Sequence, residues 1–253
     1  MENSYSQNFN VDSLHVDYEK KYSLCGLMRH FHAAVEKHAY DLGVDANSIL
    51  DKFKAIWIIT RIRIDIDRMP VWQNDITVET FPLSPGIVRM EREAKFAFGG
   101  ETFARLSSEW CMLDKDTGRP RRPGQTGYPV SMAHREGFVT AGYSKFAPDY
   151  NEADLAFTHT VRVSDLDMNV HMNNVAYIRL AGDAFGTREL TDKRLSSFEI
   201  IFKAQSFEGE DIRVYRAAAG DNKYYVSGIK TDGTRVFDTM FTFAALENSE
   251  AEI

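Results

Sequence analysis

The chain repeats one order of secondary-structure patterns, and this repeat is the feature that most restricts its fold. In the first half, apolar residues at steps of three and four predict a helix over residues 23–43, with Ser23 as its N-cap. Strand-like runs follow, and in "RIRIDID" isoleucine alternates with charged residues, which is typical of a half-buried antiparallel strand. The first half therefore predicts a sheet that covers one long helix.

The second half shows the same order. Its helical pattern is "NNVAYIRLAGDAFG", with one apolar face made of Tyr177, Ile178, Ala181 and Phe185. The later segment "DIRVYRA" matches "DITVETF" when Ile212 is aligned with Ile76, an offset of 136 residues (212 minus 76). One helix and four or five antiparallel strands, occurring twice, predict an α+β chain of two similar domains.

The stretch between the halves contains four of the seven prolines and lacks apolar periodicity. Such composition is typical of a linker and not of a third core. We therefore expect an N-terminal domain over residues 1–115, a linker over 116–154 and a C-terminal domain over 155–253.

The bulk composition excludes several classes of partner. A formal net charge of -7 argues against nucleic-acid binding and against attachment to an anionic membrane surface. No apolar run is long enough to span a bilayer, and the N-terminus has no signal-peptide pattern. Two cysteines, Cys25 and Cys111, are too few for a disulfide framework. We expect a cytoplasmic protein.

Asp167, Asn169 and His171 occupy alternate positions of "DLDMNVHMNN", just before the second helical pattern. Alternate residues of an extended segment share one face, so the spacing predicts that these three side chains point the same way. A helix needs one cap, and Asn173 or Asn174 is sufficient for that role. The other polar residues therefore indicate a functional site. His15, Asp17 and Glu19 have the same spacing before the first helix, and we interpret them as surface residues of a degenerate copy.

A calcium loop is an alternative for this segment, but its pattern fails. The sixth position should be glycine and is Val170, and the twelfth should be glutamate and is Ala176. One histidine is also too few for a transition-metal site. We expect neither a metal nor a cofactor.

These residues suit attack on a carbonyl group. An Asp and a His can position and deprotonate water, or the Asp can attack directly, and an Asn amide can orient the water or the substrate. A helix N-terminus stabilises a developing oxyanion. No unusually strong acid is apparent, which favours a good leaving group such as a thiol. Thioester hydrolysis fits best, with amide or ester hydrolysis left open.

Two segments carry a resemblance to a known family. "VRVSDLDMNVHMNNVAYI" closely resembles the active-site motif of the acyl–acyl carrier protein thioesterases of plants and bacteria. "WIITRIRIDIDRMPVWQNDITVETFP" resembles the strand pair, beginning with Trp, of that family's N-terminal half. The resemblance covers about residues 5–245. It implies two tandem hotdog domains that hydrolyse fatty acyl–acyl carrier protein in fatty acid biosynthesis.

The resemblance also implies roles for individual residues. Asp167, Asn169 and His171 match the family's catalytic residues, in the second domain, while the first domain holds most of the acyl tail. The substrate-binding candidates are Trp57, Asn173 and Asn174. Trp57 either covers the acyl tunnel or fills the first core, and Asn173 is either a cap or a functional residue.

The chain departs from the family at one position. Where the family usually has a glutamate after this helix, the chain has Gln205, which cannot accept a proton. The base would then be Asp167 or His171. Two alternatives stay open: an acyl-CoA thioesterase, and a non-catalytic protein that binds acyl thioesters.

Acyl carrier protein is acidic, so docking requires a local basic patch on this chain. One candidate contains Arg119, Arg121 and Arg122, and the other contains Arg61 and Arg63. The sequence is compatible with a monomer or a homodimer, because two fused hotdog domains can imitate the dimer of a single-domain protein.

Overall fold

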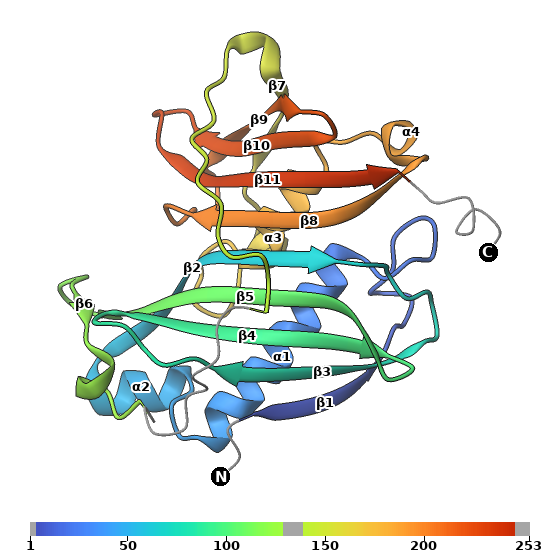
Figure 1. Cartoon of the computed structure of the whole chain (residues 1–253). Coiled ribbons are helices and arrows are strands. Elements are labelled where there is room, and N and C mark those ends of the chain that lie inside the picture. The colour runs from blue at the N-terminus through green and yellow to red at the C-terminus, as the bar shows by residue number, and fades with distance from the viewer. Residues whose placement is uncertain (1–3, 129–138, 246–253) are drawn as a thin grey trace. The chain divides into compact units, whose positions relative to one another are not determined.

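The computed structural model describes residues 4–128 and 139–245. The chain divides into two compact units, unit 1 over Met1–Gly142 and unit 2 over Tyr143–Ile253. The division falls inside the expected linker, of which residues 129–138 lie outside the described part. Each unit contains an antiparallel sheet and a helix against it (Figure 1).

Unit 1 begins with a strand that precedes its long helix. Its elements are β1 (Tyr5–Asn10), α1 (Leu24–Asp41), α2 (Ala46–Phe53), β2 (Ala55–Ile66), β3 (Asp75–Pro82), β4 (Arg89–Phe98), β5 (Glu101–Asp114), β6 (Pro120–Arg121) and the 3-10 turn η1 (Pro123–Gln125). The sheet runs in the order β1-β3-β4-β5-β2, and β6 pairs with β5. Neighbouring strands are antiparallel throughout.

Helix α1 confirms the predicted helix closely. The Ser23 side chain accepts the N–H of Gly26, as an N-cap does, and the helix ends at Asp41. Its buried face carries Leu27, Phe31 and Val35, the apolar residues of the predicted stripe. Burial of such side chains contributes about 1.5–3 kcal/mol each, which makes this face the main anchor of the sheet on the helix.

Unit 2 follows the same plan with shorter helices. Its elements are η3 (Glu152–Asp154), β7 (Leu155–Thr160), η4 (Val163–Asp165), α3 (Asn174–Gly182), α4 (Thr187–Leu190), β8 (Lys193–Phe202), β9 (Asp211–Gly220), β10 (Lys223–Lys230) and β11 (Arg235–Ala245). The order of the strands is β8-β11-β10-β9-β7. This arrangement mirrors the order in unit 1, with β7 in the position of β1.

The strand registers confirm the internal repeat. Asn10 pairs with Asp75 in unit 1, and Thr160 pairs with Asp211 in unit 2. The offset of 136 residues inferred from Ile76 and Ile212 therefore also relates β3 to β9 (211 minus 75).

Helix α3 is shorter than the sequence pattern predicted. It ends at Gly182, so Phe185 lies beyond its last turn. The Phe185 ring instead packs edge-on against Phe241, with ring centroids 4.9 Å apart, and against Tyr224 at 5.4 Å. In unit 2 aromatic side chains therefore fill space over the sheet beyond the end of the helix.

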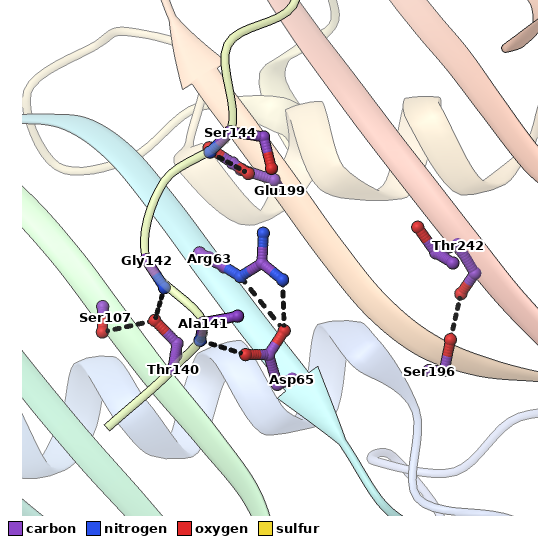
Figure 2. A network of polar contacts seen from close by, with 10 residues as sticks. All are labelled: Arg63, Asp65, Ser107, Thr140, Ala141, Gly142, Ser144, Ser196, Glu199 and Thr242. Atoms are coloured by element: carbon purple, nitrogen blue, oxygen red, sulfur yellow. Dashed lines mark hydrogen bonds and ion pairs between the residues drawn. The ribbon is translucent and has the colours of Figure 1, made fainter. Parts of the chain in front are cut away.

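The segment that joins the units is bound through its backbone to acidic side chains. Its N–H groups donate as follows: Val139 to Glu93 at 2.8 Å, Ala141 to Asp65 at 2.7 Å, and Ser144 to Glu199 at 3.1 Å. Figure 2 shows the last two of these contacts, together with the hydrogen bond between the hydroxyls of Ser107 and Thr140. This part of the expected linker is thus attached to the unit on either side and is not a free tether.

Gly228 leaves room for the packing of α3 on the sheet. A Cβ atom on Gly228 would lie 2.4 Å from Phe237, whose ring contacts Tyr177 of α3 at 5.8 Å. We expect Gly228→Ala to lower the free energy of unfolding by about 1–3 kcal/mol through overpacking. Urea unfolding followed by circular dichroism would measure the loss. Gly182→Ala is the control, because no atom lies within 4 Å of its Cβ; equal unfolding midpoints for the two variants would contradict this account.

Candidate active site

The segment that carries Asp167, Asn169 and His171 forms a tight turn. The Asp167 N–H donates to the His171 carbonyl at 2.8 Å, and the Val170 N–H donates to the Asp167 carbonyl at 3.0 Å. The Asp167 carboxylate also accepts the N–H of Asn169 at 2.8 Å. The prediction of an extended segment was therefore wrong, because the carboxylate bond and the left-handed backbone of Val170 (φ 63°) reverse the chain.

The turn changes how the three side chains are arranged. A backbone hydrogen bond joins Asp167 to His171 at the closed end of the turn, and both residues are half-buried. Asn169 lies toward its tip and is exposed. The two residues that can act as bases are thus neighbours through their backbones, while Asn169 is accessible to a ligand from outside.

A buried carboxylate just before the turn fixes its position. Asp165 is 3% exposed and accepts hydrogen bonds from His159 at 2.8 Å, the N–H of Arg162 at 2.9 Å and Arg179 at 2.6 Å. Burial opposes ionisation, but these donors and the positive charges of His159 and Arg179 together hold the pKa of Asp165 below its usual range. The sequence pattern does not predict this role for Asp165, because its side-chain partners His159 and Arg179 lie on β7 and α3.

Asn173 is the N-cap of α3. Its side chain accepts the N–H of Val175 at 2.8 Å, and its carbonyl accepts the N–H of Ala176 at 2.9 Å. Two N–H groups at the helix N-terminus are therefore already occupied. The cap accounts for Asn173 without a substrate, and Asn174, the first residue of α3, is half-buried.

A second loop lies beside the turn and includes Gln205. The Met172 N–H donates to the Ser206 carbonyl at 2.9 Å, and the ring of Phe207 lies edge-on to that of His171 with centroids 5.2 Å apart. Gln205 itself is exposed. The position at which the family usually has a glutamate is therefore adjacent to a residue that contacts the turn.

Tyr177 is a buried polar residue near the turn that the sequence analysis treated only as part of an apolar helix face. Burial raises the pKa of Tyr177, and the negative charges of Glu210 and Asp167 add to the rise. Its hydroxyl is buried and has no hydrogen-bond partner among the described residues. No local signal distinguishes such a tyrosine from an ordinary core residue.

Two further carboxylates near this region have other partners. Glu199 is 1% exposed and accepts the N–H of Ser144, and Glu210 pairs with Lys230 at 2.7 Å. Glu208 lies exposed in the loop of Gln205. Within the described residues, no group of three or more His, Cys, Asp or Glu side chains could hold a metal ion.

Unit 1 contains the same turn with different side chains. The Asp17 N–H donates to the Lys21 carbonyl at 2.8 Å, and the Asp17 carboxylate accepts the N–H of Glu19 at 2.9 Å. Lys20 has φ 62°, which matches Val170 at an offset of 150 residues (170 minus 20). The backbone of the turn is therefore shared by both units, and only the residue types distinguish the candidate site.

Trp57 lies on β2 among partly buried aromatic residues of unit 1. Its indole N–H donates to the Val44 carbonyl at 2.9 Å, and its ring is edge-on to those of Trp110 and Tyr128. It packs against a core cluster that includes Met90. These contacts fix the ring of Trp57 within unit 1.

The arginines of the two expected basic patches differ in their pairing. Arg121 is ion-paired with Asp114, and Arg63 is ion-paired with Asp65 at 2.8 Å. Arg119 and Arg122 are exposed. Neither patch therefore presents all of its positive charge to a partner.

Comparison with known proteins supports the resemblance along the chain. The models of the Acyl-ACP thioesterase N-terminal domain and of the Acyl-ACP thioesterase C-terminal domain match residues 2–123 and 149–238. The chloroplastic palmitoyl-acyl carrier protein thioesterase of Arabidopsis thaliana is 30% identical over 233 residues, which cover 85% of this chain and 55% of that protein. Oleoyl-acyl carrier protein thioesterase 2 of the same plant is 26% identical over 69% of this chain and 52% of that protein. The chain spans about half the length of these relatives.

Solved structures confirm the fold. An acyl-ACP thioesterase from Bacteroides thetaiotaomicron superposes with a TM-score of 0.88 at 22% identity, covering 96% of this chain and 98% of that one. The 12:0-ACP thioesterase from Umbellularia californica gives 0.85 at 19% identity, covering 97% and 99%. The predicted α+β hotdog fold is thus confirmed. No helix in residues 4–128 or 139–245 has the length and apolarity needed to cross a membrane.

Asp165 provides a test of what holds the turn in place. We expect Asp165→Asn to lower the free energy of unfolding at pH 7 by about 1–3 kcal/mol, because buried hydrogen bonds to a charged group are lost. The pKa of Asp165 is lowered by folding, so its stabilising effect is present above about pH 4 and is lost as the pH falls below that value. Urea unfolding at pH 7 and at about pH 3 would measure both effects.

The matched control is Asp183→Asn, which removes another carboxylate that pairs with Arg179, at 3.6 Å, but is 53% exposed. Surface ion pairs contribute about 0–1 kcal/mol, so this variant should differ little from the wild type. A loss for Asp165→Asn that stayed the same at both pH values would contradict the ionic role of Asp165.

Proposed function

This chain belongs to the acyl-ACP thioesterase family, and on this ground we propose that it hydrolyses fatty acyl–acyl carrier protein to free fatty acid and carrier protein. The observation that supports the proposal is the turn of unit 2, where a backbone hydrogen bond joins Asp167 to His171 and Asn169 between them is exposed. The equivalent turn of unit 1 has Asp17, Glu19 and Lys21, a set without a histidine or an asparagine.

The proposed reaction is attack of water on the thioester carbonyl. His171 or Asp167 removes a proton from the water as the new C–O bond forms, and the carbonyl electrons move onto oxygen. When the tetrahedral intermediate collapses, the C–S bond breaks and the sulfur leaves as a thiolate, which then takes up a proton. Direct attack by Asp167 through an anhydride is the alternative route. Asn169 orients the water or the carbonyl by hydrogen bonding.

Gln205 restricts which residues can act as the base. A glutamine donates and accepts hydrogen bonds but does not take up a proton near neutral pH, so the proton must go to His171 or Asp167. The exposed position of Gln205, next to the loop residue that contacts Met172, supports a role in orienting water. The same substitution also favours the second candidate function, a protein that binds acyl thioesters without hydrolysing them.

We assign the acyl tail to unit 1 and the thioester to unit 2. The partly buried aromatic side chains around Trp57, which pack on Met90 and Met112, would provide an apolar wall for a fatty chain. At the start of α3, Asn174 would contact the substrate, and Asn173 would do so through its amide NH2, since its Oδ1 caps the helix. The partner is acyl carrier protein, and the chain would act as a monomer or a homodimer.

The first test is release of free thiol from acyl–acyl carrier proteins of several chain lengths, beside the matching acyl-CoAs. We expect release from the carrier substrate, with a loss of about 10²–10⁴-fold in rate for His171→Ala if it is the general base. Asp167→Ala should cause a loss as well.

The repeated turn provides matched controls. Asp17→Ala and Lys21→Ala alter the same backbone turn in unit 1 and should keep the full rate. Equal losses for the variants in both turns would mean that folding and not chemistry is affected. Faster release from acyl-CoA would favour the acyl-CoA thioesterase, and binding of the acyl carrier protein without release would favour the binding protein.

A second variant tests the role of Gln205. If Gln205 only orients water, Gln205→Ala removes about one hydrogen bond, and the rate should fall by about ten-fold or less. The measurement is kcat for an acyl–acyl carrier protein, compared with His171→Ala under the same conditions. A loss as large as that of His171→Ala would show that Gln205 is essential in the reaction.

A further inference from the structure

Val170 has an unusual backbone for its type. It lies between Asn169 and His171 with φ 63°, in the left-handed region that branched side chains rarely adopt. Its side chain is 65% exposed, so no packing compensates for the strain. Lys20 occupies the same place in unit 1 with φ 62°, which means that the turn itself does not require an apolar residue. The strained backbone is therefore common to both turns, and what distinguishes Val170 is the exposed branched apolar side chain.

Val170 is accompanied by other exposed apolar side chains. Val163 is 74% exposed, Met168 79% and Phe207 45%. Their loops are joined by backbone hydrogen bonds, from Gly209 to Val161 at 2.9 Å and from Met172 to Ser206 at 2.9 Å. We call Val163, Met168, Val170 and Phe207 the apolar rim. Exposed apolar side chains on loops that are joined in this way are a candidate interaction site.

The charges beside the apolar rim favour an acidic partner. Arg162 is exposed and makes no ion pair within the described residues. Arg179 and Lys203 are exposed cations whose partner carboxylates, Asp165 and Asp238, are buried. A partner would therefore meet the positive member of the Lys203 pair, while Arg179 also pairs with the exposed Asp183 at 3.6 Å. The exposed acids here are Asp183 and Glu208.

We propose that the apolar rim is the surface on which acyl carrier protein docks, an inference that rests on the proposed function. A carrier delivers its thioester on a prosthetic arm, so it must dock within reach of that arm from Asp167 and His171, and the loops that hold these residues meet this requirement. Its acidic surface suits the exposed cations, and its apolar contacts would cover Val170 and its neighbours. An acyl-CoA shares the arm but lacks the protein surface, so it would not use the rim.

The test is Val170→Asn, because asparagine accepts the left-handed backbone but removes the apolar side chain. We expect the urea midpoint to stay the same or rise. The kcat/KM for acyl–acyl carrier protein should fall by about five-fold or more, as for the loss of one interface anchor, while that for the acyl-CoA of equal chain length should not change. Lys20→Asn is the matched control, with the same relief of strain and no change in either kcat/KM.

Two results would overturn the docking surface. An equal loss for both substrates would mean that the apolar rim contacts the shared arm, and no loss for either would mean that it binds nothing. If the wild type hydrolyses neither substrate, the proposed function has failed. The apolar rim is then tested by titrating acyl–acyl carrier protein into the wild type and into Val170→Asn. Weaker binding to Val170→Asn supports the docking surface, and equal binding or no binding to either protein overturns it.

Discussion

The buried carboxylate of Asp165 is the interaction on which the candidate site depends. It connects β7 through His159, the start of η4 through the Arg162 N–H, and α3 through Arg179. The carbonyl of the same residue accepts the N–H of Asn173, at the far side of the turn, at 2.8 Å. One residue therefore fixes both ends of the segment that carries Asp167 and His171. A charge with several donors in a buried place resists reorganisation, which keeps that segment in a single arrangement.

Comparison of the two units separates the contribution of the backbone to the candidate site from that of the side chains. Both contain a turn closed by an aspartate, a residue with a left-handed backbone and an N-capped helix. Unit 1 keeps this geometry with Glu19 and Lys21, which form an ion pair with each other at 3.0 Å. The backbone conformation of the turn therefore serves to connect a strand to the following helix and does not by itself make a catalytic site. A catalytic site also requires Asn169 and His171 in place of Glu19 and Lys21.

The fold was predicted well because it depends on apolar patterns that extend over many residues. The site was predicted less well because it depends on individual contacts that such patterns do not reveal. The helix over residues 24–41 and the repeated order of strands were clear, because long apolar periods reflect burial directly. Strand β1 was missed because its sequence "YSQNFN" is mostly polar and its burial alternates only weakly. The turn was predicted as extended because period two says nothing of a carboxylate that bonds to its own backbone. The surroundings of Tyr177 and Asp165 could not be predicted, because they include residues that are distant in the sequence.

The attachment of residues 139–144 affects how this protein can be divided. In unit 1 the N–H of Val139 reaches Glu93, which is 0% exposed, and in unit 2 the N–H of Ser144 reaches Glu199, which is 1% exposed. Division between residues 142 and 143 leaves each donor in the same unit as its acid. A cut or an inserted tag directly beside Val139 or Ser144 would instead disturb a donor to an acid that has little access to water. The exposed hairpin at Gly99 and Gly100, with both residues in left-handed conformations, is a more suitable place to open the chain.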